Sequence, residues 1–325
     1  MNLYKIIKKI FLPASLVLAV ILACFVPEFG IKMKNTVNQN IFIVVVFVIC
    51  GIQTSISELH ITKKSLFFLV CGAVMTLFLC PLFAWGITFL LGLASLQAAG
   101  LIVVAAAPPT LSSGIVMTET AGGNNVTAIA ITMLYNLAAV FTIPLVLAFA
   151  IATDAGINTN PWNMLKKLFL LVVIPFAAGF IFKSMIRMKK SPSYLSFISS
   201  FAVFMLVLFF FSASSDKMKA ISAMVLLKGF IAAIIIHLGS MASFWYGAKA
   251  LKLPAGECKA YLFTAASKTL TIALTTLAII GAGDGDAVAP CIIFYFFQMI
   301  FDSFLAAKMG LSRKENPPAG QESKA

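Results

Sequence analysis

Apolar residues run along this chain in long stretches, separated by short segments rich in charged residues, glycine or proline. A helix that spans a membrane needs about 20 predominantly apolar residues. Ten stretches are of about that length, at 10–29, 40–56, 65–93, 96–120, 126–152, 164–186, 195–214, 220–251, 260–280 and 287–308. The pattern predicts an all-α polytopic membrane protein with ten transmembrane helices. Residues 1–308 would form a single transmembrane unit, and 309–325 a cytoplasmic polar tail.

The composition supports this interpretation and argues against an enzyme. Of the 325 residues, 61% are apolar and 11% charged, with a mean hydropathy of +1.02. Soluble domains are about 45–50% apolar and about 25% charged. Ten spans leave no room for a soluble catalytic domain, and no GxSxG, HExxH, Walker or deaminase motif occurs. The six cysteines form no CxxC pair, so we expect neither a disulfide framework nor a zinc site, and no cofactor.

Basic residues predict the orientation of the chain. With ten spans, 16 of the 24 Lys and Arg residues fall on the side of the two termini and six on the other. The remaining two, Lys228 and Lys268, lie inside apolar runs. Cytoplasmic loops are enriched in Lys and Arg, so we expect both termini to lie in the cytoplasm. We expect the protein itself to lie in the plasma or inner membrane of the cell. The net charge of +13 is then a matter of topology and of contacts to anionic lipid, not of nucleic acid.

The ten runs divide into two groups of five, about 10–152 and 164–308. Because five is odd, a duplicated five-helix unit would enter the membrane in opposite orientations. The fourth and ninth runs, which occupy equivalent places, are both interrupted, by Pro108-Pro109 and by Ser267-Lys268-Thr269. Interrupted helices at matching positions of two halves indicate the binding site of a transporter. We therefore predict two inverted repeats with interrupted helices four and nine.

The interruptions have a chemical consequence. Lipid cannot satisfy a freed peptide group, so a broken helix must face protein or water. Prolines remove two donors at the first break, and the half-helix after a break presents N–H groups and a positive dipole end. An anionic group would be stabilised there, although a proline kink with back-bonded serines is the alternative. The candidate binding residues are Pro108, Pro109, Thr110, Ser112, Ser113, Thr132, Asn136, Ser267, Lys268 and Thr269.

Lys268 is the most unusual of these residues. An ammonium near the middle of a span costs several kcal/mol unless it is paired or hydrated. About eight or more residues separate it from either end of its run, too far to reach the interface easily. Two roles remain open: a fixed cation that donates to carbonyls freed by the breaks, or a coupling group that exchanges a proton. Lys228 lies nearer an end and is expected to extend to the outer interface.

Other polar residues in the runs have two interpretations each. Thr132, Tyr135 and Asn136 share a face of the fifth run, as Tyr295 and Gln298 do in the tenth. They either line a cavity or join neighbouring helices.

Titratable residues outside the breaks suggest ordinary roles. His237 is either a satisfied core histidine or a proton relay, and Asp302 is expected to be an interfacial carboxylate. Glu119 would end its helix on the cytoplasmic side. The segment 281–286, GAGDGD, is a plain turn rather than a nucleotide or calcium loop.

At the two breaks the chain resembles a known family. Residues 108–124, PPTLSSGIVMTETAGGN, are similar to the bile acid:sodium symporter superfamily. Residues 267–271, SKTLT, resemble the (H/S)-K-(S/T)-L signature of the branch that contains the seventh human member and its bacterial and fungal relatives. The resemblance covers about 10–308.

The resemblance implies inverted five-helix repeats, with a panel of helices one, two, six and seven and a core of helices three to five and eight to ten. Helices four and nine would cross at the midplane, and the core would move against the panel. The implied function is secondary transport of a small organic solute, expected to be anionic, by alternating access. Eukaryotic relatives suggest an alternative, a membrane regulator of calcium homeostasis. A polar cavity favours transport, since a regulator needs none. A small-molecule solute and the lipid bilayer are the expected partners.

The family's sodium sites carry over only in part. The first would lie near Ser112, Ser113 and Thr132, with Ala128 in place of a second hydroxyl. The bridging glutamate of the bile acid carriers falls at or near Leu262, and the glutamine of the second site near Thr76. These losses argue against ordinary sodium coupling, and Lys268 would stand in the place of a sodium ion. We expect freed carbonyls and hydroxyls to hold its ammonium, with Ser112, Ser113 and Thr132 as its neighbours. The coupling ion, if there is one, would be Na⁺ or H⁺.

The topology makes a testable prediction. Cysteines are introduced at Asp284 and at Ser191 in a background without the native cysteines, and intact cells receive an impermeant thiol reagent. The 16-to-6 distribution of basic residues predicts labelling at Asp284→Cys and none at Ser191→Cys until the cells are lysed. The reverse pattern would overturn the orientation.

Overall fold

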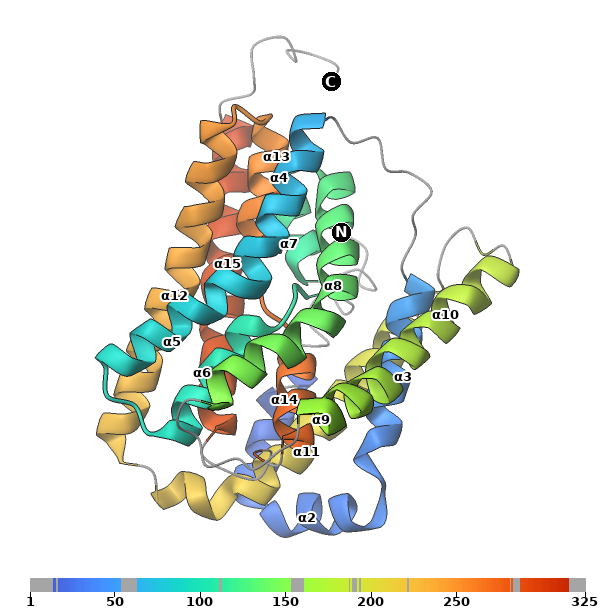
Figure 1. Ribbon diagram of the computed structural model, residues 1–325, viewed down its shortest axis with the longest axis vertical. Coiled ribbons are helices and arrows are strands. Elements are labelled where there is room, and N and C mark those ends of the chain that lie inside the picture. The colour runs from blue at the N-terminus through green and yellow to red at the C-terminus, as the bar shows by residue number, and fades with distance from the viewer. Residues whose placement is uncertain are drawn as a thin grey trace.

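A computed structural model describes residues 14–15, 17–53, 63–110, 113–152, 161–186, 188, 192, 194–220, 222–280, 282 and 287–315. Their regular structure is entirely helical (Figure 1). The first half contains helical residues 17–25, α2 (Pro27–Thr36), α3 (Gln39–Gln53), α4 (Lys63–Val74), η1 (Met75–Leu79), α5 (Cys80–Leu90), α6 (Ser95–Ala106), α7 (Ser113–Thr120) and α8 (Asn125–Ala152). The second half contains α9 (Pro161–Leu168), η2 (Phe169–Val173), α10 (Ile174–Met185), α11 (Tyr194–Ala220), α12 (Ala223–Ala250), α13 (Ala255–Ala260), η3 (Tyr261–Ala265), α14 (Leu270–Ile279) and α15 (Val288–Glu315).

The described helices confirm an all-helical membrane protein. Four are long and apolar enough to cross a membrane, at 63–90, 197–215, 223–250 and 288–311. A fifth span results if α2 and α3, which meet at 81°, are counted together. Shorter apolar helices occupy 95–106, 125–139 and 169–185. Each predicted run overlaps helical residues, but the number of ten spans and the inverted repeat stay predictions.

The helices fall into two visible groups. Figure 1 shows α3 and α10 leaning away from an upright bundle that includes α4, α8, α12 and α15. Two glycines let α3 and α10 approach closely: a Cβ at Gly51 would lie 2.1 Å from the Phe176 carbonyl oxygen, and one at Gly179 only 2.0 Å from that of Val48. Small residues at such contacts allow tight helix packing in membranes. These two helices therefore form one closely packed unit beside the bundle.

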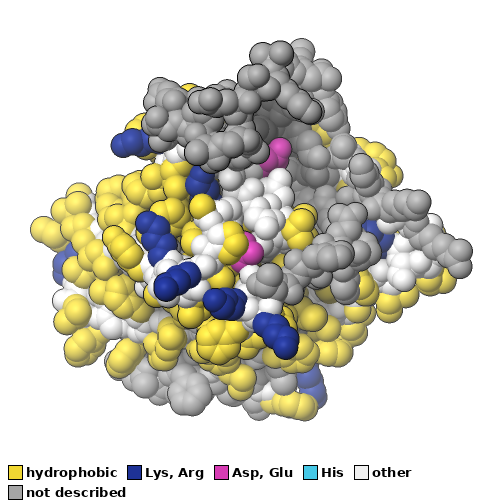
Figure 2. Space-filling view, turned by 90° about the horizontal axis from the view of Figure 1, so that it is seen from above, with side chains coloured by type: hydrophobic (Ala, Val, Ile, Leu, Met, Phe, Trp, Pro, Cys, Tyr) yellow, Lys and Arg dark blue, Asp and Glu magenta, His cyan; other side chains and the backbone are white. Residues whose placement is uncertain are grey.

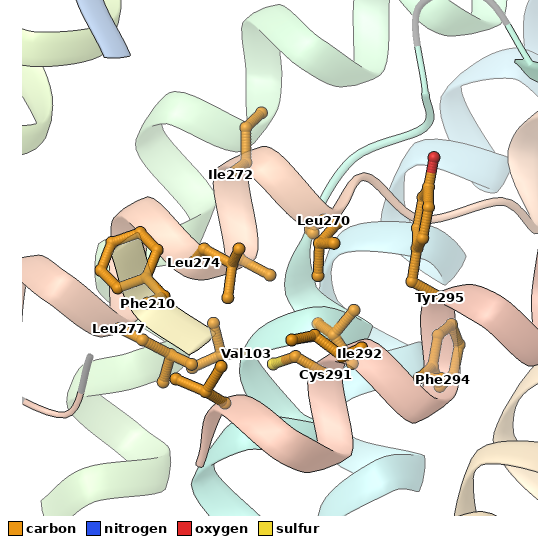
Figure 3. Close-up of a cluster of buried hydrophobic side chains, with 14 of the residues drawn as sticks. Val103, Phe210, Leu270, Ile272, Leu274, Leu277, Cys291, Ile292, Phe294 and Tyr295 are labelled. Atoms are coloured by element: carbon orange, nitrogen blue, oxygen red, sulfur yellow. The ribbon is translucent and has the colours of Figure 1, made fainter. Parts of the chain in front are cut away.

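Within the bundle, α14 packs its apolar face inward. Leu270, Leu274 and Leu277 of α14 lie near Val103 of α6 and Ile292 of α15 (Figure 3). All five are largely or fully buried. This cluster packs α14 against α6 and α15 and so fixes the position of its first turn, which directly follows the second break.

The predicted interfacial position of Asp302 is wrong. Asp302 is 1% exposed, and its Oδ1 lies 2.8 Å from Nε2 of His237, which is fully buried. The reason is that Asp302 lies on the face of α15 that packs against α12, and that α15 continues to Glu315, about two turns beyond the predicted boundary at 308. His237 is thus a core histidine with a carboxylate partner. The pair joins α12 to α15 among aromatic rings.

This pair predicts a specific pattern of stability. Removing one partner of a buried pair leaves an uncompensated charge or polar group and costs about 3–5 kcal/mol, whereas replacing both by apolar residues is much less costly. We expect His237→Leu and Asp302→Leu each to lower the melting temperature of the purified protein in detergent. The double variant should melt above both single variants. If the decrease in melting temperature of the double variant equalled the sum of the two single decreases, the two side chains would not act as a pair.

Candidate functional site

The two interruptions predicted from the sequence lie against each other. The first separates α6 from α7, and the second separates η3 from α14. The Thr269 N–H donates to the Pro108 carbonyl at 3.0 Å, which joins the two breaks directly. Ser112, a predicted site residue, lies outside the described residues.

Two amide side chains hold the breaks in place, one from each half of the chain. Asn136 of α8 donates through Nδ2 to the carbonyls of Pro109 at 3.0 Å and Thr132 at 2.7 Å. Gln298 of α15 binds both sides of one residue: its Oε1 accepts from the Lys268 N–H at 2.7 Å, and its Nε2 donates to the Lys268 carbonyl at 3.1 Å. Both amides are buried and satisfy peptide groups that the breaks remove from helices.

The Lys268 side chain points into the bundle. It is 1% exposed, and its Nζ donates to the Thr76 carbonyl at 2.9 Å. Among the described residues, no carboxylate lies within ion-pair distance of this ammonium. Lys268 is therefore a buried cation held by a backbone carbonyl.

The carbonyl that binds Lys268 is freed by a local irregularity. Thr76 lies in η1, a π-helical turn two residues before Pro81. In the π-turn the hydrogen bonds run from residue i to residue i−5, as the Cys80 N–H donates to the Met75 carbonyl. Pro81 is five residues after Thr76 and has no N–H, so it supplies no donor to the Thr76 carbonyl. Thr76 also donates through Oγ1 to the Ala265 carbonyl at 3.0 Å, next to the second break. Both the carbonyl and the hydroxyl of Thr76 thus join η1 to the residues of the second break.

The predicted neighbours of the ammonium make other contacts. Ser113 shares a hydrogen bond with Thr110, whose Oγ1 also accepts from the Gly114 N–H at 3.1 Å and so caps α7. Thr132 donates to the Ala128 carbonyl at 2.9 Å. Expecting Ser113 and Thr132 to hold Lys268 was wrong, because the side chain turns toward η1 instead.

Hydroxyl oxygens keep acceptor capacity after donating, so Ser113 and Thr132 retain lone pairs for a cation. Ser267 likewise uses its hydroxyl as a donor, to the Thr264 carbonyl at 2.9 Å. The described residues contain no group of three or more His, Cys, Asp or Glu that could hold a metal ion. Any cation bound here would depend on hydroxyls and carbonyls.

A cavity of about 70 Å³ lies where the breaks meet α3 and α11. Its polar lining comes from both breaks, α8, α14, α15 and α11, namely Thr110, Asn136, Thr269, Thr271, Tyr295 and Ser199. In Figure 3 the Tyr295 hydroxyl points away from the apolar cluster beneath α14. Val46, Phe47 and Cys50 of α3 form the facing wall. No carboxylate or lysine is among the lining residues.

The first turn of α14 gives this cavity its electrostatic character. Thr269 to Ile272 all line it, and Thr269, the N-cap, makes no side-chain capping bond. The first N–H groups of a helix lack intrahelical partners and carry a partial positive charge. Lys268 comes directly before the N-cap and adds a full positive charge near this end of the helix. The cavity is therefore suited to an anionic or strongly hydrogen-bond-accepting group.

Sequence reasoning missed three parts of the site. It did not find the Thr76 carbonyl, because a π-turn has no reliable signature, although Pro81 marks a disturbed helix. It did not single out Thr271, which lies in the first helical turn after the break. The wall from α3 and α11 consists of ordinary apolar residues with a single serine, and no pattern distinguishes them from core.

Known proteins that resemble this chain are membrane transporters. The chloroplastic protein named "Probable sodium/metabolite cotransporter BASS4" of Arabidopsis thaliana is 24% identical over 317 residues, which cover 91% of this chain and 71% of that protein. The "Sodium/bile acid cotransporter 7" of Danio rerio is 23% identical over 323 residues, 94% of this chain and 95% of its own length. These relatives confirm the resemblance to the bile acid:sodium symporters. A family model matches residues 11–310, and the chain belongs to the SBF-like CPA transporter family.

Proposed function

We propose that this protein is a secondary transporter that moves a small organic anion across a cell membrane by alternating access. The observation that carries the proposal is the polar cavity at the contact between the two broken helices. Within the hydrocarbon layer of a membrane, unwound backbone is tolerated only where it is buried in the protein or lines a water-filled space. The names of the relatives, which refer to metabolites and bile acids, support a solute of this class.

The anionic group of the solute would bind at the start of α14. Thr269 to Ile272, at the start of this helix, line the cavity together with Thr110, and the N–H groups of a first helical turn lack intrahelical partners. Asn136 is less available, because its amide nitrogen already donates to two carbonyls. Lys268 would add a favourable potential without touching the solute, since its Nζ is turned toward Thr76.

The size of the cavity indicates a closed conformation. Sites for drug-sized ligands measure about 300–1,000 Å³, several times the volume of about 70 Å³ found here. A solute could enter only if the wall formed by α3 and α11 moves away from the broken helices. The close packing of α3 against α10 makes those helices suited to move as one body. This is the movement of core against panel that the family resemblance implies.

Lys268 would replace one coupling cation. A buried ammonium that binds a freed carbonyl occupies the kind of position that a sodium ion takes when bound by main-chain oxygens. Transport would then be only weakly coupled to sodium, or it would be coupled to H⁺.

We also propose that both termini lie in the cytoplasm and that the membrane is the plasma or inner membrane.

The first experiment is an uptake screen of labelled organic anions in proteoliposomes, with Pro108→Ala/Pro109→Ala as the test variant. Restoring the peptide donors should let the helix continue through the break and withdraw the backbone groups from the cavity. We expect saturable uptake by the parent protein and at least a tenfold loss in the variant, with insertion retained. Normal uptake by the variant would reduce the break to a kink. No saturable uptake of any solute would contradict transport itself.

The second experiment replaces Lys268. Lys268→Ala should abolish or strongly reduce uptake, and Lys268→Gln should keep the fold while losing transport, because the charge and not the chain length is required. Parent uptake should change little when sodium is replaced by potassium. Lys228→Gln, a lysine of α12 outside the site, is the matched control and should transport normally. A steep sodium dependence together with normal flux in Lys268→Ala would refute the cation replacement.

A further inference from the structure

A buried acid–base pair, His237 and Asp302, lies between α12 and α15, outside the solute cavity. The two side chains are 0% and 1% exposed, whereas Figure 2 shows other basic and acidic side chains at the surface of the upper end of the molecule. Ionisable residues buried inside membrane-spanning helices are costly, and they commonly mark a path or a binding site for ions or protons. The pair is therefore a candidate ionic site as well as a link between two helices.

The contacts of His237 leave one ring nitrogen that can take up a proton. Because an ionised carboxylate only accepts hydrogen bonds, Nε2 donates to Oδ1 of Asp302 at 2.8 Å, and the neutral ring has its lone pair on Nδ1. Among the described residues, Nδ1 has no hydrogen-bond partner. In this state the pair carries one net negative charge, and a proton added at Nδ1 brings the net charge to zero.

Three aromatic rings surround the histidine. The ring centroids of Phe294, Phe297 and Phe301 lie 5.8, 5.9 and 6.4 Å from that of His237. The face of an aromatic ring attracts a cation within about 6 Å of its centre. These rings exclude water from the pair and can still accommodate the protonated imidazole.

Among the described residues, no hydrogen bond or ion pair joins His237 or Asp302 to a further titratable group. On α15 and on the elements packed against α12 or α15, the buried titratable side chains are Cys80, Glu257, Cys258, Tyr261, Cys291 and Tyr295. Tyr295 lines the solute cavity, and the other five are hydrogen-bonded to groups outside the pair. The described charged side chains of these helices that are not buried lie toward the helix ends, namely Glu119, Lys228, Lys249, Lys259 and Lys308.

The pair shares a helix with the solute cavity. Asp302 lies two turns along α15 from Tyr295, which lines the cavity, and this is about 10 Å at a rise of about 1.5 Å per residue. Between them, Gln298 binds the N–H and the carbonyl of Lys268. Two unit charges about 10 Å apart, at an effective dielectric constant of about 20, change a binding constant about tenfold. The charge of the pair is thus close enough to affect an anion in the cavity.

We propose that His237 and Asp302 form a proton-binding site that couples the transport of the anion to that of a proton, an inference that rests on the transport proposed above. Without the proton, the negative charge of the pair offsets part of the positive field of Lys268 and α14. One proton bound at Nδ1 removes that net charge, so the cavity becomes more positive and binds the anion more tightly. By reciprocity, a bound anion raises the affinity of the pair for the proton. Lys268 stays a fixed cation throughout.

The first measurement detects the proton. The chain contains two histidines, so His60→Gln leaves His237 as the single one. The ring nitrogens of this protein, labelled with ¹⁵N-histidine in liposomes, are followed by solid-state NMR over about pH 5–8, where histidine ordinarily changes charge. We expect Nδ1 to become protonated as the pH falls, with Nε2 protonated throughout. In Asp302→Asn, whose amide oxygen can still accept from Nε2, Nδ1 should stay unprotonated. An Nδ1 that never titrates, or that titrates equally in Asp302→Asn, would overturn the proposal.

The second measurement detects the potential in the cavity and does not require the solute. Ser199 of α11 lines the cavity, and Ser199→Cys is introduced into a chain without the native cysteines. Its modification rates are measured with the anionic sulfonatoethyl and the cationic trimethylammonioethyl methanethiosulfonate, and the ratio of the two rates reports the local potential. We expect the anionic-to-cationic ratio to rise at least about tenfold when the pH is lowered from about 8 to about 5.

Two variants in the Ser199→Cys protein decide the assignment. Asp302→Asn has the net charge of the protonated pair, so its ratio should be high at both pH values. Glu119→Gln, which removes an exposed carboxylate at the end of α7, is the matched control and should keep the pH dependence. A low ratio in Asp302→Asn, or a pH dependence that survives in it, would overturn the coupling. Neither measurement uses uptake, so failure of this proposal is distinguishable from failure of the transport proposal, which the uptake screen decides.

Discussion

Inside a bilayer, a peptide group without its helical hydrogen bond needs a partner within the protein. This chain has two such helix breaks, and they contact each other. Asn136 and Gln298 are the side chains that satisfy this need, each on a continuous helix beside one break. Gln298 binds the N–H and the carbonyl of a single residue, so it fixes the orientation of that peptide as well as its position. The contact between the two breaks, the position of the α14 first turn and the cavity beside it all depend on these contacts.

The same requirement explains how a lysine remains buried without a carboxylate. The π-turn η1 frees the Thr76 carbonyl, and the second break places Lys268 opposite it. Each irregularity alone would cost stability, because one leaves a carbonyl and the other an ammonium without a partner. Together they satisfy each other. The resulting positive charge belongs to the residue before the N-cap of α14, and it has the same sign as the partial charge of that helix N-terminus.

Much of this arrangement could be predicted from the sequence, for reasons that differ from residue to residue. The interruptions at Pro108 and Lys268 were visible, because proline and charge are rare inside apolar runs. Asn136 and Gln298 were visible as polar positions, but helix spacing could not say which carbonyls they bind. The partner of Lys268 was not predictable, since a backbone carbonyl has no sequence signature. Asp302 was misplaced because the end of an apolar run is a poor guide to the end of a helix.

The central claim is that the buried charge of Lys268 acts as a fixed cation at the crossing of the two breaks. Its most direct test is chemical rescue of Lys268→Ala, which removes the ammonium with three methylenes and leaves a space of that shape. The melting temperature of the variant and of the parent protein is measured with n-propylammonium, sodium or choline as the chloride salt. We expect n-propylammonium to raise the melting temperature of Lys268→Ala above its value in choline, with no such effect on the parent protein. A variant as stable as the parent in choline, and indifferent to every added cation, would contradict it.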